Sequence, residues 1–401
     1  MNITPNANRK HISIFGKTNV GKSSLINSIC GQDVAVVSNI SGTTTDPVSK
    51  AMELIPVGPV LFIDTAGLDD TTELGQSRMK KTMDIMKRTD FALFVIDINK
   101  IDSSDYEKIK LEFKKYNIPH LLVINKIDTI EKDKLKDIKE KYKDAILIST
   151  YTLEGIDKLK NTIINKLQSF ESEPSIIGNL VPYGGKVVLV VPIDSEAPKG
   201  RLILPQVQCI RDCLDNGIKT YIVRDTELAS ALEDIKDIDL VITDSQAFKK
   251  VDKIVPNSIN LTGFSILFAN HKGNLTSFVN GAKKIKSLNK ESKILIAESC
   301  SHNVSHEDIG RVKIPKLLNN YVGAELKYDF IVGYDFPLDI KDYDLIIHCG
   351  GCMINRKTIL NRIDFCKNED VAITNYGIAL AFLSGILDRS LEVFRDNNII
   401  K

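Results

Sequence analysis

Residues 16–23, Gly-Lys-Thr-Asn-Val-Gly-Lys-Ser, constrain the fold of this chain more than any other segment. They follow an apolar run, His11–Phe15, and precede a helical pattern, Ser24–Cys30. A loop of this kind between a strand and a helix turns its backbone amides toward phosphate groups, and the helix N-terminus adds positive potential. The sequence therefore predicts a P-loop, and with it an α/β domain with a parallel sheet, at the start of the chain.

Two side chains of this loop and two residues downstream carry the predicted phosphate chemistry. Lys22 is expected to neutralise the β- and γ-phosphate oxygens, and Ser23 to offer its hydroxyl to Mg²⁺. The apolar run Val60–Ile63 ends in Asp-Thr-Ala-Gly, where we expect Asp64 to hold the magnesium through water and the Gly67 amide to sense the γ-phosphate. This combination predicts a switch that is coupled to nucleotide hydrolysis.

The Asn-Lys-Ile-Asp motif at residues 125–128 predicts which base is bound. It follows an apolar strand, and the Asp128 carboxylate can accept paired hydrogen bonds from the guanine N1 and N2 groups, which adenine lacks. The predicted nucleotide is therefore GTP. Ser149 and Thr150 follow the next strand, where this fold usually places a Ser-Ala pair over the base. The other predicted nucleotide-binding residues are Gly16, Asn19, Gly21, Ser24, Asn125 and Lys126.

The segment Ser41–Asp46 resembles the switch I loop of the bacterial GTPases that include the tRNA-modification and ribosome-assembly enzymes. Aligned on its glycine and aspartate, this loop makes Thr44 a magnesium ligand and puts Thr45 where these GTPases usually have arginine. Leu68 stands where signalling GTPases have a water-positioning glutamine, so we expect slow hydrolysis. The resemblance also implies that Asn19 helps to bind a potassium ion that activates hydrolysis.

Composition argues against several classes of partner. The chain has 401 residues, 43% of them hydrophobic, which is enough for two or three domains with cores of their own. Lys plus Arg total 53 against 52 for Asp plus Glu, so no basic field favours nucleic acid. Residues 1–10 lack the apolar core of a signal peptide, and runs such as Ile378–Leu383 are too short to span a membrane. We therefore predict a cytoplasmic protein whose clustered cysteines are metal or redox candidates.

The middle of the chain predicts a small βαβαβ layer. Strand patterns at Val187–Val191, Tyr221–Val223 and Leu240–Thr243 alternate with helical ones. No second phosphate loop or catalytic pair occurs there, and so small a sheet has exposed edges and a thin core, so its predicted role is dimerisation. Asp194, in a polar loop after the first of these strands, could reach a metal in another domain or subunit; alternatively, the loop makes only its own turn hydrogen bonds.

The third region resumes the alternation from Leu275 onward and predicts a second parallel α/β sheet. Cys300 and His302 follow one apolar strand directly, and a His-Cys-Gly-Gly-Cys segment at residues 348–352 follows another about 45 residues later. The carboxyl ends of parallel strands meet at one edge of a sheet. Both groups could therefore converge on one metal.

Two kinds of metal site fit these side chains. Three thiolates can bind three irons of a [4Fe-4S] cluster and leave the fourth iron to an exchangeable ligand or to none. The thiolates are those of Cys300, Cys349 and Cys352, and the candidate fourth ligands are His302, His348 and Asp194. The alternative is a tetrahedral zinc with three cysteines and one histidine. The remaining cysteines lie in apolar helical patterns and are predicted to be buried: Cys30, Cys209, Cys213 and Cys366.

The order of these features resembles the [FeFe]-hydrogenase maturation GTPase family over essentially the whole chain. The resemblance implies a [4Fe-4S] cluster on Cys300, Cys349 and Cys352, with His302 and His348 near its exchangeable position. It implies a homodimer formed through the middle domain. It also implies a scaffold that carries the diiron subcluster built by two radical-SAM maturases and delivers it to apo-[FeFe]-hydrogenase, with GTP hydrolysis governing association with these partners.

The resulting expectation is an α/β protein of three domains: a P-loop GTPase domain at 1–173, a βαβ dimerisation domain at 174–264 and a parallel α/β cluster-binding domain at 265–401. Two other functions stay open. One is a GTPase controlled by an iron–sulfur redox sensor, and the other is a tRNA-modification-type GTPase with a structural zinc site. The near-neutral charge and the absence of a basic patch weigh against the second of these.

Overall fold

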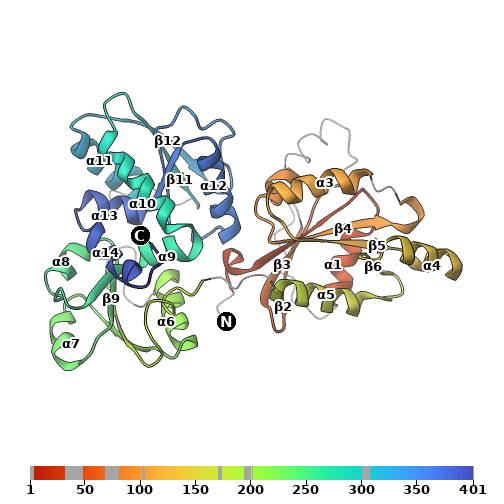
Figure 1. Cartoon of the computed structure of the whole chain (residues 1–401), viewed down its shortest axis with the longest axis horizontal. Coiled ribbons are helices and arrows are strands. Elements are labelled where there is room, and N and C mark those ends of the chain that lie inside the picture. The colour runs from red at the N-terminus through yellow and green to blue at the C-terminus, as the bar shows by residue number, and fades with distance from the viewer. Residues whose placement is uncertain are drawn as a thin grey trace. The chain divides into compact units, whose positions relative to one another are not determined.

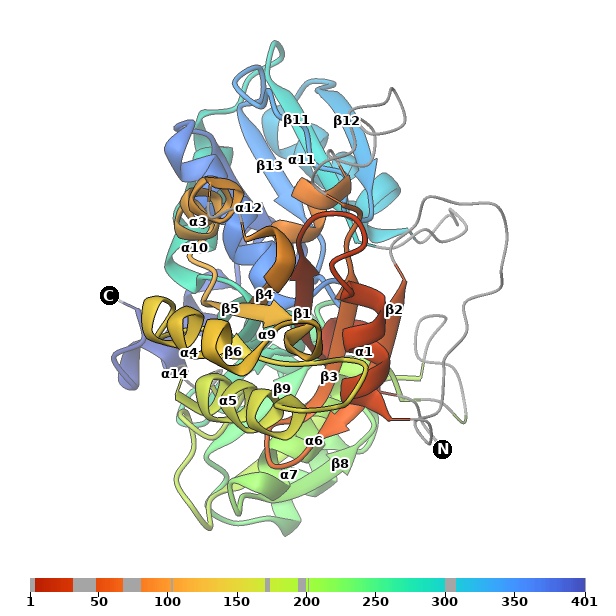
Figure 2. The same ribbon diagram turned by 90° about the vertical axis from the view of Figure 1, so that its right-hand side faces the viewer.

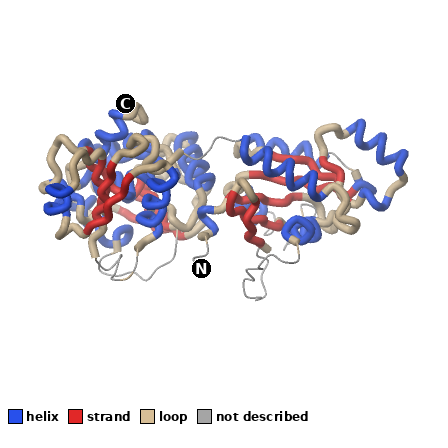
Figure 3. Tube along the Cα trace, turned by 90° about the horizontal axis from the view of Figure 1, so that it is seen from below, coloured by secondary structure: helices blue, strands red, loops and turns tan. Residues whose placement is uncertain are grey.

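The computed structural model describes residues 4–31, 48–67, 81–101, 104–169, 174–193, 200, 202–299 and 308–400. The chain divides into two compact units, Met1–Ser172 and Glu173–Lys401. In both units the strands form an inner layer with helices on both sides (Figure 3). No helix in these described ranges is both long and apolar enough to cross a membrane.

The first unit is built on a six-stranded sheet with the order β2-β3-β1-β4-β5-β6 (Figure 1). β2 and β3 pair antiparallel, and the other neighbouring strands pair parallel. β1, β4 and β5 are buried along nearly their whole length, which is why their sequences are almost continuously apolar. The bounds are β1 Lys10–Phe15, β2 Ser49–Leu54, β3 Gly58–Asp64, β4 Phe91–Asp97, β5 His120–Asn125 and β6 Ile146–Leu147.

Helices cover both faces of this sheet. α1 and α5 pack against one face, where Leu25 and Ile163 join the same apolar cluster (Figure 2). α3 packs against the other face through Phe113. α4 has no buried side chain, in agreement with the alternating charges of its sequence. The bounds are α1 Lys22–Cys30, α3 Ser104–Lys115, α4 Lys132–Lys141 and α5 Ile156–Ser169, and residues 81–86 are also helical.

The second unit contains two four-stranded parallel sheets, with the orders β10-β9-β7-β8 and β12-β11-β13-β14. The first has one strand more than the sequence patterns predict, because β10 spans only four residues that include a threonine and a glycine. The bounds are β7 Lys186–Val190, β8 Lys219–Val223, β9 Leu240–Thr243, β10 Asn260–Gly263, β11 Lys293–Glu298, β12 Lys327–Val332, β13 Leu345–His348 and β14 Ala372–Asn375.

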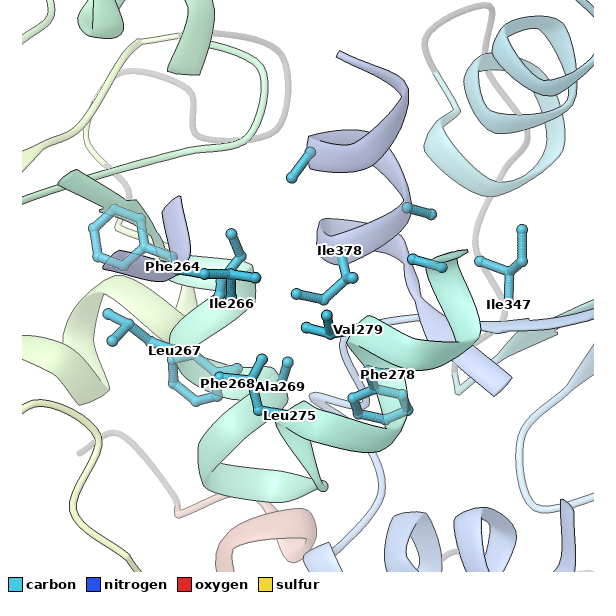
Figure 4. Packing of buried hydrophobic residues seen from close by; sticks show 14 of the residues in the cluster. Phe264, Ile266, Leu267, Phe268, Ala269, Leu275, Phe278, Val279, Ile347 and Ile378 are labelled. Atoms are coloured by element: carbon cyan, nitrogen blue, oxygen red, sulfur yellow. The ribbon is translucent and has the colours of Figure 1, made fainter. Parts of the chain in front are cut away.

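The two sheets of this unit share one hydrophobic core. Phe264 and Leu267, at the start of the helix that follows β10, belong to the same cluster as Ile347 of β13 (Figure 4). The last helix packs back on the first sheet, where Thr262 Oγ1 donates to the Ser390 carbonyl at 2.9 Å. The helices are α6 Leu204–Asp215, α7 Leu228–Asp234, α8 Phe248–Asp252, α9 Phe264–Lys272, α10 Leu275–Lys283, α11 Ile314–Val322, α12 Arg356–Asn368, α13 Tyr376–Leu383 and α14 Leu387–Asp396.

The two sheets also have the same topology. In each, the first strand along the chain lies between the second and the third, and the fourth is at the edge beside the third. The Lys186 N–H donates to Asp239 Oδ2 at 2.8 Å, and the Lys293 N–H donates to Asp344 Oδ2 at 2.9 Å, at the same place in each sheet. Residues 235–240 and 340–345 both read Ile-Lys-Asp-x-Asp-Leu. The second unit is thus a duplicated α/β layer, which the alternation of strands and helices alone did not reveal.

Candidate functional site

The predicted P-loop connects β1 to α1 and lies against the carboxyl ends of the neighbouring strands. Gly16 and Gly21 have φ angles of 149° and 97°, which L side chains rarely adopt. A Cβ at Gly16 would lie 2.4 Å from the Val95 carbonyl oxygen, and one at Gly21 would lie 2.3 Å from Asn125 Nδ2. The loop therefore requires glycine at both positions to sit close to β4 and β5.

Lys22 and Ser23 open α1 and face polar groups of the first unit. Lys22 Nζ is buried and donates to the carbonyls of Gly16 and Lys17 at 3.1 and 2.9 Å. The Ser23 hydroxyl donates to Asp64 Oδ2, while Asp64 Oδ1 is buried and has no hydrogen-bond partner within the described ranges. Burial raises the pKa of the Asp64 carboxyl. The serine and the aspartate thus offer hard oxygen atoms, the ligand type that Mg²⁺ prefers, beside the phosphate loop.

Asn125, at the end of β5, ties two loops together. Its side chain is fully buried, its Nδ2 donates to the Val20 carbonyl at 3.0 Å, and its Oδ1 accepts from the Thr150 N–H at 3.1 Å. Thr150 Oγ1 also accepts from Asn125 Nδ2 at 3.3 Å, so the threonine that departs from the usual Ser-Ala pair has a structural partner. Asn125 therefore fixes the P-loop against the loop that follows β6.

Lys126 crosses over the P-loop. Its backbone is left-handed, with φ 68°, and its Nζ donates to the Asn19 carbonyl at 2.9 Å and to Asp97 Oδ2 at 2.7 Å. Burial opposes ionisation of Asp97, but hydrogen bonds from Lys126 and Asn99 outweigh it and lower the pKa of this carboxyl. Lys126, Asn19 and Asp97 also line a pocket of about 240 Å³. The ion pair with Asp97 therefore fixes Lys126 in the wall of this pocket.

Asp128 and Ser149 form the remaining part of the predicted base site. The Ser149 hydroxyl donates to the Asp128 carboxylate, and its oxygen accepts from the N–H groups of Tyr151 and Thr152 at 3.2 and 3.0 Å. Asp128 remains exposed, so its carboxylate is oriented by the serine and open to a ligand. Gly67 and Ser24 are described as well, whereas Thr44, Thr45 and Leu68 lie outside the described residues.

Asp97 was not among the residues singled out from the sequence. The signal for it was present, because it ends a strand, β4, that is otherwise apolar and buried, in the same way that Asp64 ends β3. A polar side chain at the carboxyl end of a central parallel strand points to the ligand crevice of an open α/β sheet. Its ion pair with Lys126 could be found only from the three-dimensional arrangement.

Asp97→Asn is expected to weaken nucleotide binding about tenfold or more, because Lys126 loses a charged hydrogen-bond partner worth about 1.5–3 kcal/mol. Titration of a fluorescent GDP analogue would measure the dissociation constant. Glu107→Gln, which removes an exposed carboxylate 3.7 Å from Lys110, is the matched control and should bind normally. Equal affinities for both variants would show that the Asp97–Lys126 pair does not shape the nucleotide pocket.

The segment His348–Cys352 follows β13 directly, next to β11. The Cys349 N–H donates to the Ala297 carbonyl at 2.8 Å, which continues the pairing of the two strands. Cys349 Sγ accepts from the Ser299 N–H at 3.1 Å and from the Gly351 N–H at 3.4 Å, and it shares a hydrogen bond of 2.7 Å with the Ser299 hydroxyl. Burial raises the pKa of the Cys349 thiol, and these hydrogen bonds act in the opposite direction.

Cys352 is half-buried and lines a pocket of about 190 Å³, which is also lined by Asp244, directly after β9, and by Ser265 of α9. Lys272 of α9 is buried and donates to the carbonyls of Gly351 and Ile354 at 3.0 and 3.3 Å. The loop between the two cysteines is therefore held from the first half of the duplicated unit. No sequence pattern pointed to Lys272.

His348 is buried, and both of its ring nitrogens have partners. Nδ1 donates to the Cys349 carbonyl at 2.7 Å, and Nε2 accepts from the Arg362 guanidinium at 2.8 Å. Burial and the charge of Arg362 lower the pKa of His348 to about 3, so the ring is neutral. The sequence did not single out Arg362.

Cys300, His302 and Asp194 lie outside the described residues. Within the described part of the chain, no three His, Cys, Asp or Glu side chains are grouped so that they could hold a metal. Ser299, the last described residue before Cys300, contacts Cys349 Sγ, and β11 and β13 are parallel neighbours. The prediction that the other four cysteines are buried is confirmed for Cys30, Cys209, Cys213 and Cys366.

Comparison with protein-family models identifies the chain. A model described as the hydrogen maturase F tetramerization domain matches residues 276–393, and one described as the hydrogen maturase F dimerization domain matches residues 176–273. A third, described as a 50S ribosome-binding GTPase, matches residues 11–126. The chain belongs to the hydrogen maturase F family.

Membership in the hydrogen maturase F family confirms the predicted resemblance. It also confirms the predicted fold class, in which a P-loop GTPase domain precedes two parallel α/β sheets. The two models specific to hydrogen maturase F both fall in the second unit, and their descriptions support self-association.

Curated relatives that are named as GTPases match part of this hydrogen maturase F chain. GTPase Der of Campylobacter hominis is 37% identical over 160 residues, 39% of this chain and 35% of the relative. The tRNA modification GTPase MnmE of Thermoanaerobacter sp. (strain X514) is 38% identical over 157 residues, 38% of this chain and 33% of the relative. The chain thus spans about a third of the length of these relatives. A crystal structure of Aquifex aeolicus Era bound to GDP and aluminium fluoride is 22% identical, with a TM-score of 0.33, and covers 53% of this chain and 93% of its own.

Proposed function

We propose that this protein is a GTP-hydrolysing scaffold that holds the diiron subcluster of [FeFe]-hydrogenase at a [4Fe-4S] cluster and delivers it to the apo-hydrogenase. The observation that carries the proposal is the Cys349 loop at the carboxyl edge of β13. Its sulfur is surrounded by hydrogen-bond donors, and the loop lies in the part of the chain that matches hydrogen maturase F. Family membership and the GTPase motifs supply the rest of the argument.

In the proposed GTPase reaction, the loop amides and Lys22 bind the phosphates, and Ser23 and Thr44 hold magnesium. Asp64 acts on the metal through water, and the Gly67 amide responds to the γ-phosphate. The close contact between Ser23 and Asp64 supports this assignment. The base is recognised by Asp128, with Asn125, Lys126, Ser149 and Thr150 shaping its site. Gly16, Gly21 and Ser24 complete the phosphate loop.

We propose further that hydrolysis is slow and stimulated by potassium bound near Asn19. Leu68 has no polar side-chain group that could orient the attacking water, so intrinsic hydrolysis lacks the contribution that a water-positioning glutamine makes. Asn19 has a left-handed backbone, with φ 62°, and its carbonyl accepts from Lys126, which fixes the residue in the wall of the pocket of about 240 Å³ that Lys126 also lines. Slow turnover suits a switch that governs association with partners.

The proposed cluster ligands are Cys300, Cys349 and Cys352. The two described cysteines fit this role, because N–H and O–H donors around a cysteine sulfur are typical of thiolates that hold iron–sulfur clusters. The cluster would supply an iron with an exchangeable position for the diiron cargo. His302 and Asp194 remain candidates for that position, whereas both ring nitrogens of His348 already have partners.

The proposed assembly is a homodimer formed through the first sheet of the second unit. β8 is an edge strand, and its Tyr221 and Ile222 are 36% and 49% exposed. An unpaired edge with exposed apolar side chains is suited to pairing with a second copy. The proposed heterologous partners, two radical-SAM maturases and apo-[FeFe]-hydrogenase, follow from the family alone.

Ile222→Glu is expected to convert the dimer largely to monomer, because it places a charge on the exposed edge of β8. Light scattering coupled to size-exclusion chromatography would measure the mass. Leu111→Glu, at a 69% exposed position of α3 in the first unit, is the matched control and should keep the mass of the parent protein. A dimeric Ile222→Glu variant would place the interface elsewhere.

Metal and sulfide analysis of the protein purified without oxygen and reconstituted tests the proposed cluster. About four irons and four sulfides per chain, with a spin-half EPR signal after reduction, are expected for a [4Fe-4S] cluster. Stoichiometric zinc that iron cannot displace would instead make the cysteine set structural. Transfer of diiron cargo to apo-hydrogenase, measured as hydrogenase activity gained, then distinguishes a carrier from a redox sensor.

A further inference from the structure

Arg362 of α12 is a buried cation with no carboxylate partner among the residues that the structure describes. Its side chain is 4% exposed. The guanidinium donates to His348 Nε2 and to the Gly333 carbonyl, both at 2.8 Å, and stacks over the Phe336 ring at 4.9 Å. In the described ranges, the ion pairs of the second unit do not include it.

A buried charge normally has a counter-charge, because a charge that is left uncompensated in the interior destabilises the folded protein. The imidazole, carbonyl and ring that surround Arg362 are neutral. Burial accordingly lowers the pKa of Arg362 to about 10. Arg362 is linked to the cysteine site by geometry, because its guanidinium contacts His348 and the His348 ring contacts the Cys349 carbonyl.

Donor and acceptor are fixed in both hydrogen bonds of the His348 ring. Because the Cys349 carbonyl can only accept, His348 Nδ1 carries the proton, and because the guanidinium can only donate, Nε2 is the acceptor. Arg362 thus fixes the tautomer and the orientation of the ring. The ring in turn holds the backbone of Cys349, where the chain leaves β13.

We propose that Arg362 is a positioning residue of the cysteine site: acting through His348, it fixes the backbone at Cys349, and its charge balances the negative charge of the thiolates and of the metal centre they hold. His348 is then a structural link between Arg362 and Cys349 and not an iron ligand. This inference rests on the proposed cluster site. It concerns outer partners of ligating groups, which tune a metal centre through orientation and charge.

The test compares Arg362→Gln, which keeps amide donors but removes the charge, with Arg362→Lys, which keeps the charge. In the reconstituted full-length protein, Arg362→Gln should release iron to a chelator about tenfold or more faster than the parent. Its cluster should also have a lower reduction potential, since a nearby positive charge favours the more negative, reduced state. Arg362→Lys should restore most of the potential.

Arg356→Gln is the matched control, since Arg356 lies on the same helix but donates to the His271 carbonyl at 2.8 Å and not to His348. Parent-like potential and iron release in Arg362→Gln would overturn the proposal. His348→Gln adds a second readout, measured by pulsed EPR of the reduced cluster. Any histidine nitrogen coupling seen in the parent protein should persist in this variant. Loss of that coupling would make His348 a ligand. If the parent protein binds no cluster, the proposed function itself fails, and that outcome is seen before any variant is compared.

Discussion

Replacing Lys22 with alanine is expected to lower the rate of GTP hydrolysis by about 10²–10³-fold, because the charge that stabilises the phosphate oxygens in the transition state is lost. Lys22 is buried in the P-loop and hydrogen-bonded to the loop carbonyls, so it is already held at the place where the phosphates bind. Phosphate release at saturating GTP would measure the effect. Iron content should not change, because the three proposed cluster cysteines lie in the other compact unit.

The matched control for this prediction is Lys87→Ala, which removes a half-buried lysine paired with Asp84 at 2.8 Å elsewhere in the first unit. It should hydrolyse GTP at the parent rate. Loss of both hydrolysis and iron in Lys22→Ala would contradict the independence of the two sites and would indicate that the nucleotide controls assembly of the metal centre.

Replacing Cys349 with serine is expected to lower the bound iron and sulfide more than tenfold, because removing a group that supports a metal site typically weakens metal binding by about that factor. GTP hydrolysis should be retained. A serine hydroxyl is a poor substitute, because iron–sulfur clusters are held by thiolates. The two N–H groups and the hydroxyl that contact Cys349 Sγ are also placed for a larger sulfur atom. Iron and sulfide analysis after anaerobic reconstitution is the measurement.

Cys209→Ala is the control for loss of a buried thiol in the same unit, since Cys209 is fully buried in α6 and burial raises the pKa of its thiol well above the usual range. This variant should keep its iron. Unchanged iron in Cys349→Ser, or equal losses in both variants, would remove Cys349 from the ligand set.

Local motifs made the nucleotide site largely predictable. Phosphate binding depends on backbone conformation within the eight residues 16–23, and the base motif occupies four consecutive residues, 125–128. Such short segments carry their geometry in their own residue types, above all the glycines at 16 and 21. The ion pair between Asp97 and Lys126 was not predictable in this way, because Asp97 ends β4 and Lys126 directly follows β5.

The cysteine motif was predictable from the sequence, but the residues that surround it in the folded protein were not. The spacing of Cys349 and Cys352 and their place after an apolar strand could be read directly. The residues that hold the loop could not, because Lys272 comes from α9 and Arg362 from α12, and both look like ordinary helix residues in the sequence. Their burial depends on how α9 and α12 pack against the sheets.

The sequence by itself determined that this chain contains a P-loop GTPase domain followed by two parallel α/β layers, since strand–loop–helix order and apolar periodicity are local properties. Tertiary structure alone decided that the two layers share one core through α9, that they repeat one topology, and that His348 is bonded to Arg362. Those features depend on contacts between segments far apart in the chain, and burial of a charged or polar side chain is specified only when the packed surroundings provide its partners.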